Sequence, residues 1–246
     1  MKTSILKYMG SLLVICSLFS CSKRTLSPDP VDDNKALEET DPTPSGNLTY
    51  VALGDSYTIG TSVAYQDNYP SQLSAALEGE LKRPISLKII AKNGWRTDNL
   101  LESLKTEQLE PNYDLVTLLI GVNNQYQGEP LKKYEKEFTQ LLQQALELAN
   151  QKTERVFVIS IPDWGFTPYG SGWDQQKISQ EIDAYNSFAK ETAEKEGVTF
   201  IEVTDITRKG LDDMELVALD GLHPSKKAYK LFVERMLPII TSSLKN

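Results

Sequence analysis

From residue 48 onward, short apolar segments alternate with longer segments whose apolar positions follow a helical period. This alternation is typical of proteins in which helices cover a parallel sheet. The short segments predict strands at residues 48–53, 85–91, 115–120, 156–161 and 199–203. The longer segments predict helices at residues 70–81, 97–108, 131–150, 175–196 and 224–244.

The helix predicted at 131–150 has the clearest pattern. Its apolar residues are spaced three or four positions apart, and lysines and glutamates occupy the positions between them. The apolar set is Tyr134, Phe138, Leu141, Leu142, Ala145 and Leu148. We expect this helix to pack one face against the sheet.

Right-handed crossovers leave few arrangements for five such units. We predict an α/β fold with a doubly wound, five-stranded parallel sheet of order 2-1-3-4-5, flavodoxin-like, with helices in layers on both faces. The sequence from residue 48 contains no internal repeat and no second linker. Residues 48–246 are therefore predicted to form one domain.

The first 47 residues lack the alternation. Lys2 and Lys7 precede an apolar stretch that is too short to span a bilayer, which is the composition of an export signal over residues 1–20. The stretch ends in Leu18-Phe19-Ser20-Cys21, which resembles the bacterial lipobox. The resemblance implies a lipid anchor on Cys21 and a place in the bacterial cell envelope, with the outer membrane favoured and the periplasmic or surface face left open. An ordinary secretory signal is the alternative.

Residues 22–47 contain four prolines and six acidic residues and have almost no aliphatic periodicity. Such a segment buries too little apolar surface to offset its ordering entropy, so residues 21–47 are predicted to be a lipidated cysteine and its disordered tether. Removal of Cys16 with the signal and lipidation of Cys21 would leave no thiol for a disulfide or a nucleophile. The net charge of −8 and the lack of clustered basic residues argue against nucleic-acid binding.

Four short motifs stand where the predicted elements begin or end. Ser56 follows the first predicted strand, Gly94 the second and Asn123 the third, and the pair Asp220 and His223 precedes the last helix. The carboxyl ends of parallel strands share one rim, where ligands bind in open α/β sheets. Pro224 is expected at the first helical position, which would place His223 on the same rim.

These residue types suit nucleophilic catalysis. A serine hydroxyl needs a base to take its proton, and the base needs a third group to orient it. His223 is the only histidine, so there are too few nitrogen ligands for a typical zinc site, and we predict no metal. Each motif alone is ordinary turn composition. Their occurrence in order on one predicted rim favours an active site.

The sequence from Leu48 to the C-terminus resembles the SGNH, or GDSL, hydrolases, in the motifs Gly54-Asp55-Ser56, Asn93-Gly94-Trp95, Gly121-Val122-Asn123-Asn124 and Asp220-Gly221-Leu222-His223. The resemblance implies that Ser56 is the nucleophile and that Asp220 and His223 complete a triad. It also implies an oxyanion hole formed by Ser56, Gly94 and Asn123, and no cofactor.

The chain departs from that family at two positions. Asn124 stands where the family usually has aspartate, and Tyr57 where many members have leucine. Tyr57, Trp95, Tyr126 and Trp164 are expected to contact the substrate. The aromatic loop at 162–173 either walls the cleft or closes the edge of the core. Asp55 is expected to cap the turn or helix that follows it.

Together, these features predict a monomeric, metal-independent carboxylester hydrolase that works through an acyl-serine intermediate on acyl or acetyl esters of carbohydrate or lipid. A lysophospholipase or a thioesterase is the alternative within the family. From another class, a surface-exposed, non-catalytic glycan-binding lipoprotein on the same fold is the alternative.

Overall fold

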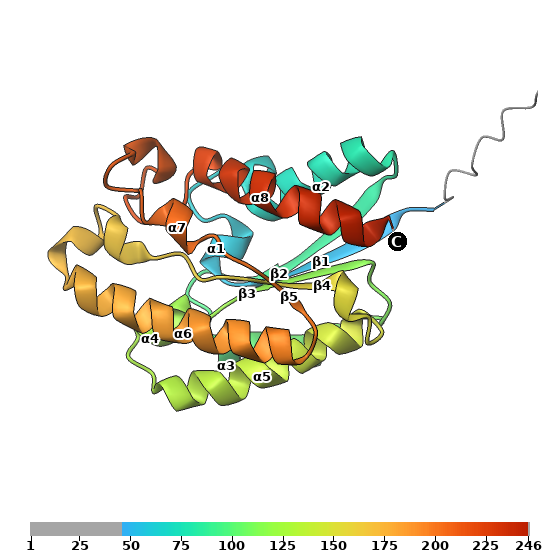
Figure 1. Cartoon of the computed structure of the whole chain (residues 1–246), viewed down its shortest axis with the longest axis horizontal. Coiled ribbons are helices and arrows are strands. Elements are labelled where there is room, and N and C mark those ends of the chain that lie inside the picture. The colour runs from blue at the N-terminus through green and yellow to red at the C-terminus, as the bar shows by residue number, and fades with distance from the viewer. Residues whose placement is uncertain (1–45, 246) are drawn as a thin grey trace, which may run out of the picture. The chain divides into compact units, whose positions relative to one another are not determined.

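The computed structural model describes residues 46–245. Five parallel strands, β1 (Leu48–Gly54), β2 (Ile85–Ala91), β3 (Leu115–Leu119), β4 (Val156–Ile159) and β5 (Thr199–Ile201), form one sheet of order β2-β1-β3-β4-β5 (Figure 1). The predicted fold class and strand order are confirmed. The predicted export signal, the lipidation site Cys21 and the tether as far as residue 45 lie outside the described residues.

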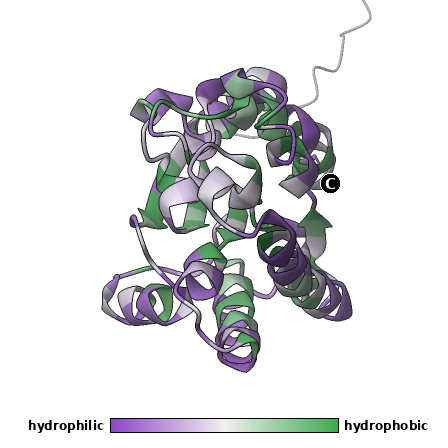
Figure 2. Cartoon of the chain, turned by 90° about the vertical axis from the view of Figure 1, so that its left-hand side faces the viewer, coloured by the Kyte–Doolittle hydropathy of each residue, from purple (hydrophilic) through white to green (hydrophobic). Residues whose placement is uncertain are grey.

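Helices cover both faces of the sheet. On one face α2 (Tyr69–Leu81) packs against α8 (Lys226–Leu244), and on the other α5 (Leu131–Leu148) contacts both α3 (Thr97–Thr106) and α6 (Gln175–Lys195) (Figure 1). These helices carry both hydrophobic and hydrophilic residues, as Figure 2 shows, because each one buries a single stripe against the sheet.

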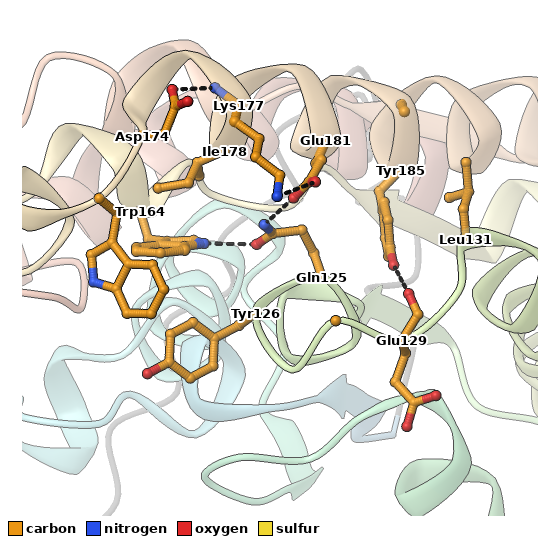
Figure 3. A pocket seen from close by; sticks show the side chains of 13 residues that line it. Gln125, Tyr126, Glu129, Leu131, Trp164, Asp174, Lys177, Ile178, Glu181 and Tyr185 are labelled. Atoms are coloured by element: carbon orange, nitrogen blue, oxygen red, sulfur yellow. Dashed lines mark hydrogen bonds and ion pairs between the residues drawn. The ribbon is translucent and has the colours of Figure 1, made fainter.

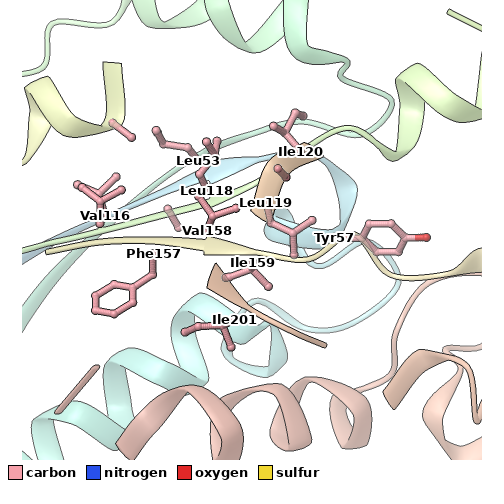
Figure 4. Close-up of a cluster of buried hydrophobic side chains, with 14 of the residues drawn as sticks. Leu53, Tyr57, Val116, Leu118, Leu119, Ile120, Phe157, Val158, Ile159 and Ile201 are labelled. Carbon is pink, nitrogen blue, oxygen red and sulfur yellow. The ribbon is translucent and has the colours of Figure 1, made fainter. Parts of the chain in front are cut away.

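The core lies along the three inner strands. All residues of β3 and β4 are buried, and so are all but one of β1, whereas the edge strand β2 is mostly half-exposed. Strands buried on both faces consist of continuous apolar runs, which explains why these segments were recognisable in the sequence. Tyr57 lies at one end of the cluster, and its hydroxyl points away from the other labelled side chains (Figure 4).

The strands end in register where the site residues begin. Gly54, at the end of β1, pairs with Ala91 of β2 and with Leu119 of β3. The loops that leave these three strands therefore start at one level of the sheet. The loops after β1 and β3 lead into short helices that were not predicted, α1 (Ser56–Ile59) and α4 (Val122–Tyr126). A third short helix that was not predicted, α7 (Thr204–Thr207), follows β5.

The expectation for Pro224 was wrong. Helix α8 begins at Lys226, and Ser225 caps it by accepting hydrogen bonds from the N–H groups of Lys227 and Ala228. Pro224 lies before the cap and forms an isolated antiparallel bridge with Val217. A serine cap satisfies two orphan N–H donors and so outweighs the tolerance of the first turn for proline.

Candidate active site

Ser56 stands at a tight junction between strand and helix. A Cβ atom on Gly54 would overlap the Thr58 side chain and the carbonyl oxygen of Leu119, so only glycine allows the chain to turn here. Asp55 caps α1 as expected: its Oδ1 accepts a hydrogen bond of 3.0 Å from the N–H of Tyr57. The turn places Ser56 as the first residue of α1, at the carboxyl end of β1.

Asp55 is fully buried, and its Oδ2 has no hydrogen-bond partner among the described residues. Burial raises the pKa of Asp55 to about 7, although hydrogen bonds from backbone N–H groups, that of Tyr57 first, oppose the shift. This carboxyl group belongs to the residue directly before Ser56, at the junction between β1 and α1.

Asp220 and His223 form a hydrogen-bonded pair. The Nδ1 of His223 lies 2.6 Å from Oδ2 of Asp220, in a turn that Gly221 permits with a φ of 74°. Burial by itself would raise the pKa of Asp220, but hydrogen bonds from Ser62, from His223 and from two backbone N–H groups lower it to about 2. The carboxylate therefore stays charged next to the imidazole, as an orienting group requires.

Ser56 and His223 line one cleft of about 300 Å³, together with Gly94 and Asn123. Both side chains are more than nine-tenths buried. Within residues 46–245 no hydrogen bond joins the Ser56 hydroxyl to the imidazole. Catalytic hydrogen bonds often tighten only when substrate is bound. The cleft thus brings together the five residues expected to carry out catalysis, with Asp220 reaching it through His223.

Three N–H donors are available near Ser56. Neither the backbone N–H of Ser56 nor that of Gly94 donates to an acceptor among the described residues. Gly94 has a φ of 78°, which favours glycine. The Nδ2 of Asn123 donates a hydrogen bond of 2.9 Å to the carbonyl oxygen of Trp95. An amide nitrogen carries a second hydrogen. The Trp95 carbonyl therefore orients the Asn123 amide and leaves one donor free for a ligand.

Asn124 has a defined structural task. It is fully buried, its Oδ1 accepts from the N–H of Thr97 at 3.0 Å, and its Nδ2 donates to Thr97 Oγ1 at 2.7 Å. The Thr97 hydroxyl donates in turn to Oε2 of Glu137 at 2.5 Å. An aspartate could not donate to this hydroxyl, so the departure from the family pattern matches the acidic partner on α5.

The aromatic residues have divided roles. Tyr57 is buried, and its ring meets the His223 ring edge-on at 5.6 Å between centroids. Trp164 is also buried, and its Nε1 donates 2.8 Å to Oε1 of Gln125, so this loop residue both closes the core and lines the cleft. Tyr126 lines the cleft and is 43% exposed. Trp95 differs from the expectation, because its indole packs on the core and is not among the cleft residues.

Sequence reasoning missed Ser62 and did not single out Tyr169 within the aromatic loop. Ser62 donates to Asp220 across 2.5 Å, and Tyr169 lines the cleft with its hydroxyl bonded to that of Tyr126. Tyr169 belongs to the aromatic loop and was recognisable only as one of several rings. Nothing local marks Ser62, which meets a residue 158 positions later.

Between residues 46 and 245, no group of three or more His, Cys, Asp and Glu side chains is arranged to hold a metal ion. In the same part of the chain, no helix combines the length and the apolar composition needed to cross a bilayer.

Solved structures of the same fold cover most of the chain. An α/β hydrolase, LAE5, from the metagenome of Lake Arreo is 18% identical with a TM-score of 0.62 over 83% of this chain and 99% of its own. TesA is 17% identical with a TM-score of 0.63 over 80% and 99%. The acetylxylan esterase Axe2 from Geobacillus stearothermophilus is 17% identical with a TM-score of 0.62 over 78% and 94%.

The chain has no match among proteins of curated function. The model of the GDSL-like lipase/acylhydrolase family matches residues 52–231, a span that runs from β1 into α8 and includes Ser56, Gly94, Asn123, Asp220 and His223. This span is well over half of the chain. The protein therefore belongs to the GDSL-like lipase/acylhydrolase family.

Proposed function

We propose that this protein is a serine carboxylester hydrolase that acts through an acyl-serine intermediate on acetyl or other short acyl esters of carbohydrate. The observation that carries the proposal is the 2.6 Å contact between Asp220 and His223 at a cleft that Ser56 also lines. No other histidine is available to act as the base.

In the proposed mechanism His223 takes the proton of Ser56 while Oγ attacks the ester carbonyl. The negative oxygen of the tetrahedral intermediate accepts hydrogen bonds from the N–H groups of Ser56 and Gly94 and from Nδ2 of Asn123, each worth about 2.7 to 4 kcal/mol of barrier. His223 then protonates the departing alcohol. Water, activated by the same imidazole, attacks the acyl-serine, and the Ser56 hydroxyl is restored as the acid leaves.

Two observations support a short acyl group on a carbohydrate. The cleft of about 300 Å³ is small and is rimmed by Tyr126 and Tyr169, whose hydroxyls suit a polar alcohol. Proteins of the same fold include an acetylxylan esterase.

We also propose that the chain is exported and anchored through a lipid on Cys21, which would hold the enzyme at the cell envelope. Mass spectrometry of the protein purified from membranes tests the anchor, because a lipid on Cys21 would add its mass to the N-terminal residue. The Cys21→Ala variant should lack this added mass.

Hydrolysis of 4-nitrophenyl acetate by the purified protein tests the function. Ser56→Ala and His223→Ala are each expected to lower kcat by about 10³-fold or more. A fluorophosphonate probe should label the wild type and not Ser56→Ala. A wild type that binds glycans but neither turns over the ester nor reacts with the probe would instead be the non-catalytic binding protein.

A further inference from the structure

A second cavity, of about 570 Å³, is larger than the cleft, and Figure 3 shows the side chains that line it. Its walls come from helices α4 and α6, the loop between β4 and α6, and the segment from Gly128 to Leu131 that leads into α5. Among the residues that line it are Gln125, Tyr126, Trp164, Trp173, Lys177 and Glu181. The proposed reaction at Ser56 uses none of the volume of this cavity.

The cavity and the cleft share two walls, Tyr126 and Trp164. The Tyr126 and Trp164 rings meet edge-on at 5.4 Å between centroids, and Trp173 meets Trp164 at 5.6 Å and Tyr126 at 6.0 Å. Tyr126 is 43% exposed and Trp173 is 56% exposed. A ligand that leaves the cleft across Tyr126 therefore meets the uncovered ring of Trp173.

Polar side chains are held in a row along the cavity wall. Trp164 donates to Gln125, and the Nε2 of Gln125 donates 2.7 Å to Oε2 of Glu181 (Figure 3). The other oxygen of Glu181 lies 3.8 Å from Nζ of Lys177. Because Gln125 is nine-tenths buried and bonded at both ends, it holds the Glu181 carboxylate in position. The Lys177 ammonium keeps donors free for a ligand.

The chemistry of this lining selects among ligands. Glu129, Asp174, Lys177 and Glu181 all contribute to the walls, and an acyl chain that covered them would desolvate charged groups without pairing them. The Glu129 carboxylate is already paired with Arg96 and Lys133. The two remaining carboxylates against one ammonium also oppose a phosphate or an acidic sugar. A neutral sugar suits both parts of the lining, since its C–H face packs on an aromatic ring while its hydroxyls bond to carboxylate and ammonium groups.

We infer that this cavity is a subsite for a neutral glycosyl unit linked to the acylated sugar at Ser56, so that the enzyme prefers acylated oligosaccharides to single acylated sugars. The inference rests on the proposed ester hydrolysis at Ser56. Trp173 is assigned the role of a stacking surface, and Lys177 that of a hydrogen-bond donor to the sugar.

The test compares O-acetylated xylotriose with O-acetylated methyl xyloside. For the wild type, kcat/KM for the trisaccharide is expected to exceed that for the monosaccharide by about tenfold. Trp173→Ala and Lys177→Ala should each remove most of this advantage through KM. Lys190→Ala is the matched control, because Lys190 lies on the same helix, also pairs with a glutamate four residues later, and does not line the cavity.

Equal values of kcat/KM for the two sugars in the wild type, or an advantage that survives in Trp173→Ala and Lys177→Ala, would overturn the subsite. The subsite would also be overturned if Trp173→Ala lost hydrolysis of 4-nitrophenyl decanoate but kept hydrolysis of 4-nitrophenyl acetate, since the cavity would then hold an acyl chain. The two proposals fail differently. Turnover of 4-nitrophenyl acetate without preference for the trisaccharide removes only the subsite, whereas no turnover of any ester removes the proposed function as well.

Discussion

The carboxylate of Asp220 and the imidazole of His223 meet at 2.6 Å, and both carboxylate oxygens are fully engaged around that contact. Oδ1 accepts the N–H groups of Leu222 and His223 at 2.9 and 3.0 Å, while Oδ2 accepts Nδ1 of His223 and the Ser62 hydroxyl. The turn and the ring are thus held by the same side chain. With Nδ1 occupied, Nε2 is the imidazole nitrogen left for Ser56.

Replacing the Asp220 carboxylate should distinguish the contribution of its charge to kcat from that of the side-chain shape. Asp220→Asn keeps the shape of the side chain but offers an amide to Nδ1, which favours the wrong tautomer, and kcat is expected to fall by about 10³- to 10⁴-fold. Ser62→Ala removes one of four donors to the carboxylate and should lower kcat by about tenfold or less. Steady-state kinetics with 4-nitrophenyl acetate measure both. Equal losses in the two variants would contradict the orienting role of the Asp220 charge.

Asn124 provides a test of matched hydrogen-bond partners. In Asn124→Asp the buried Thr97 hydroxyl would face two carboxylates with one hydrogen, so the free energy of unfolding should fall by about 1 to 3 kcal/mol. Adding Glu137→Gln supplies an amide that can donate to this hydroxyl, and it should recover part of the loss. Denaturant unfolding of the single and double variants gives the coupling energy. Strictly additive losses would contradict the proposed partnership.

The buried Asp55 predicts a pH dependence of stability. Its pKa is about 7 in the folded protein, compared with about 3.9 for an exposed aspartate. Between these values the folded state holds a proton that the unfolded state has lost, so the free energy of unfolding decreases as pH rises from about 4 to about 7. Asp55→Asn removes this dependence. The difference in free energy of unfolding between Asp55→Asn and the wild type should therefore shift in favour of the variant by up to about 4 kcal/mol from pH 4 to pH 8.

Denaturant unfolding at the two pH values measures this difference. Asp212→Asn is the control, because it removes one carboxylate from an exposed position. The same pH dependence in the wild type and in Asp55→Asn would show that other groups cause it.

Two glycines of the site should respond differently to alanine. Gly54→Ala places a methyl group against the Leu119 backbone and the Thr58 side chain, and is expected to cost about 3 kcal/mol or more or to prevent folding. Around Gly94 nothing lies within 4 Å of a Cβ atom, so Gly94→Ala pays only for its left-handed φ, about 1 to 2 kcal/mol. Thermal unfolding distinguishes the two. Comparable losses would mean that space at Gly54 does not limit the fold.

The inner strands were predictable because they are buried on both faces and therefore appear as unbroken apolar runs. The strand order was predictable because right-handed crossovers leave few arrangements for five such units. Short helices such as α1 and α4 were not, since four or five residues contain too little periodicity to stand out from a loop. Pro224 misled the prediction because the capping serine that follows it decides where α8 begins.

By itself, the sequence determined the strands and the nature and chain order of the groups suited to ester hydrolysis, because hydrophobic periodicity and residue chemistry are local properties. The strand order followed from the sequence only together with the rule that crossovers are right-handed. Only the tertiary structure decided which distant groups support them. Ser62 meets Asp220 across 158 positions, and Glu137 reaches Thr97 from another helix. The cavity beside the cleft likewise exists only once α4, α6 and the loop after β4 have packed together, since no single segment of the chain encodes its shape.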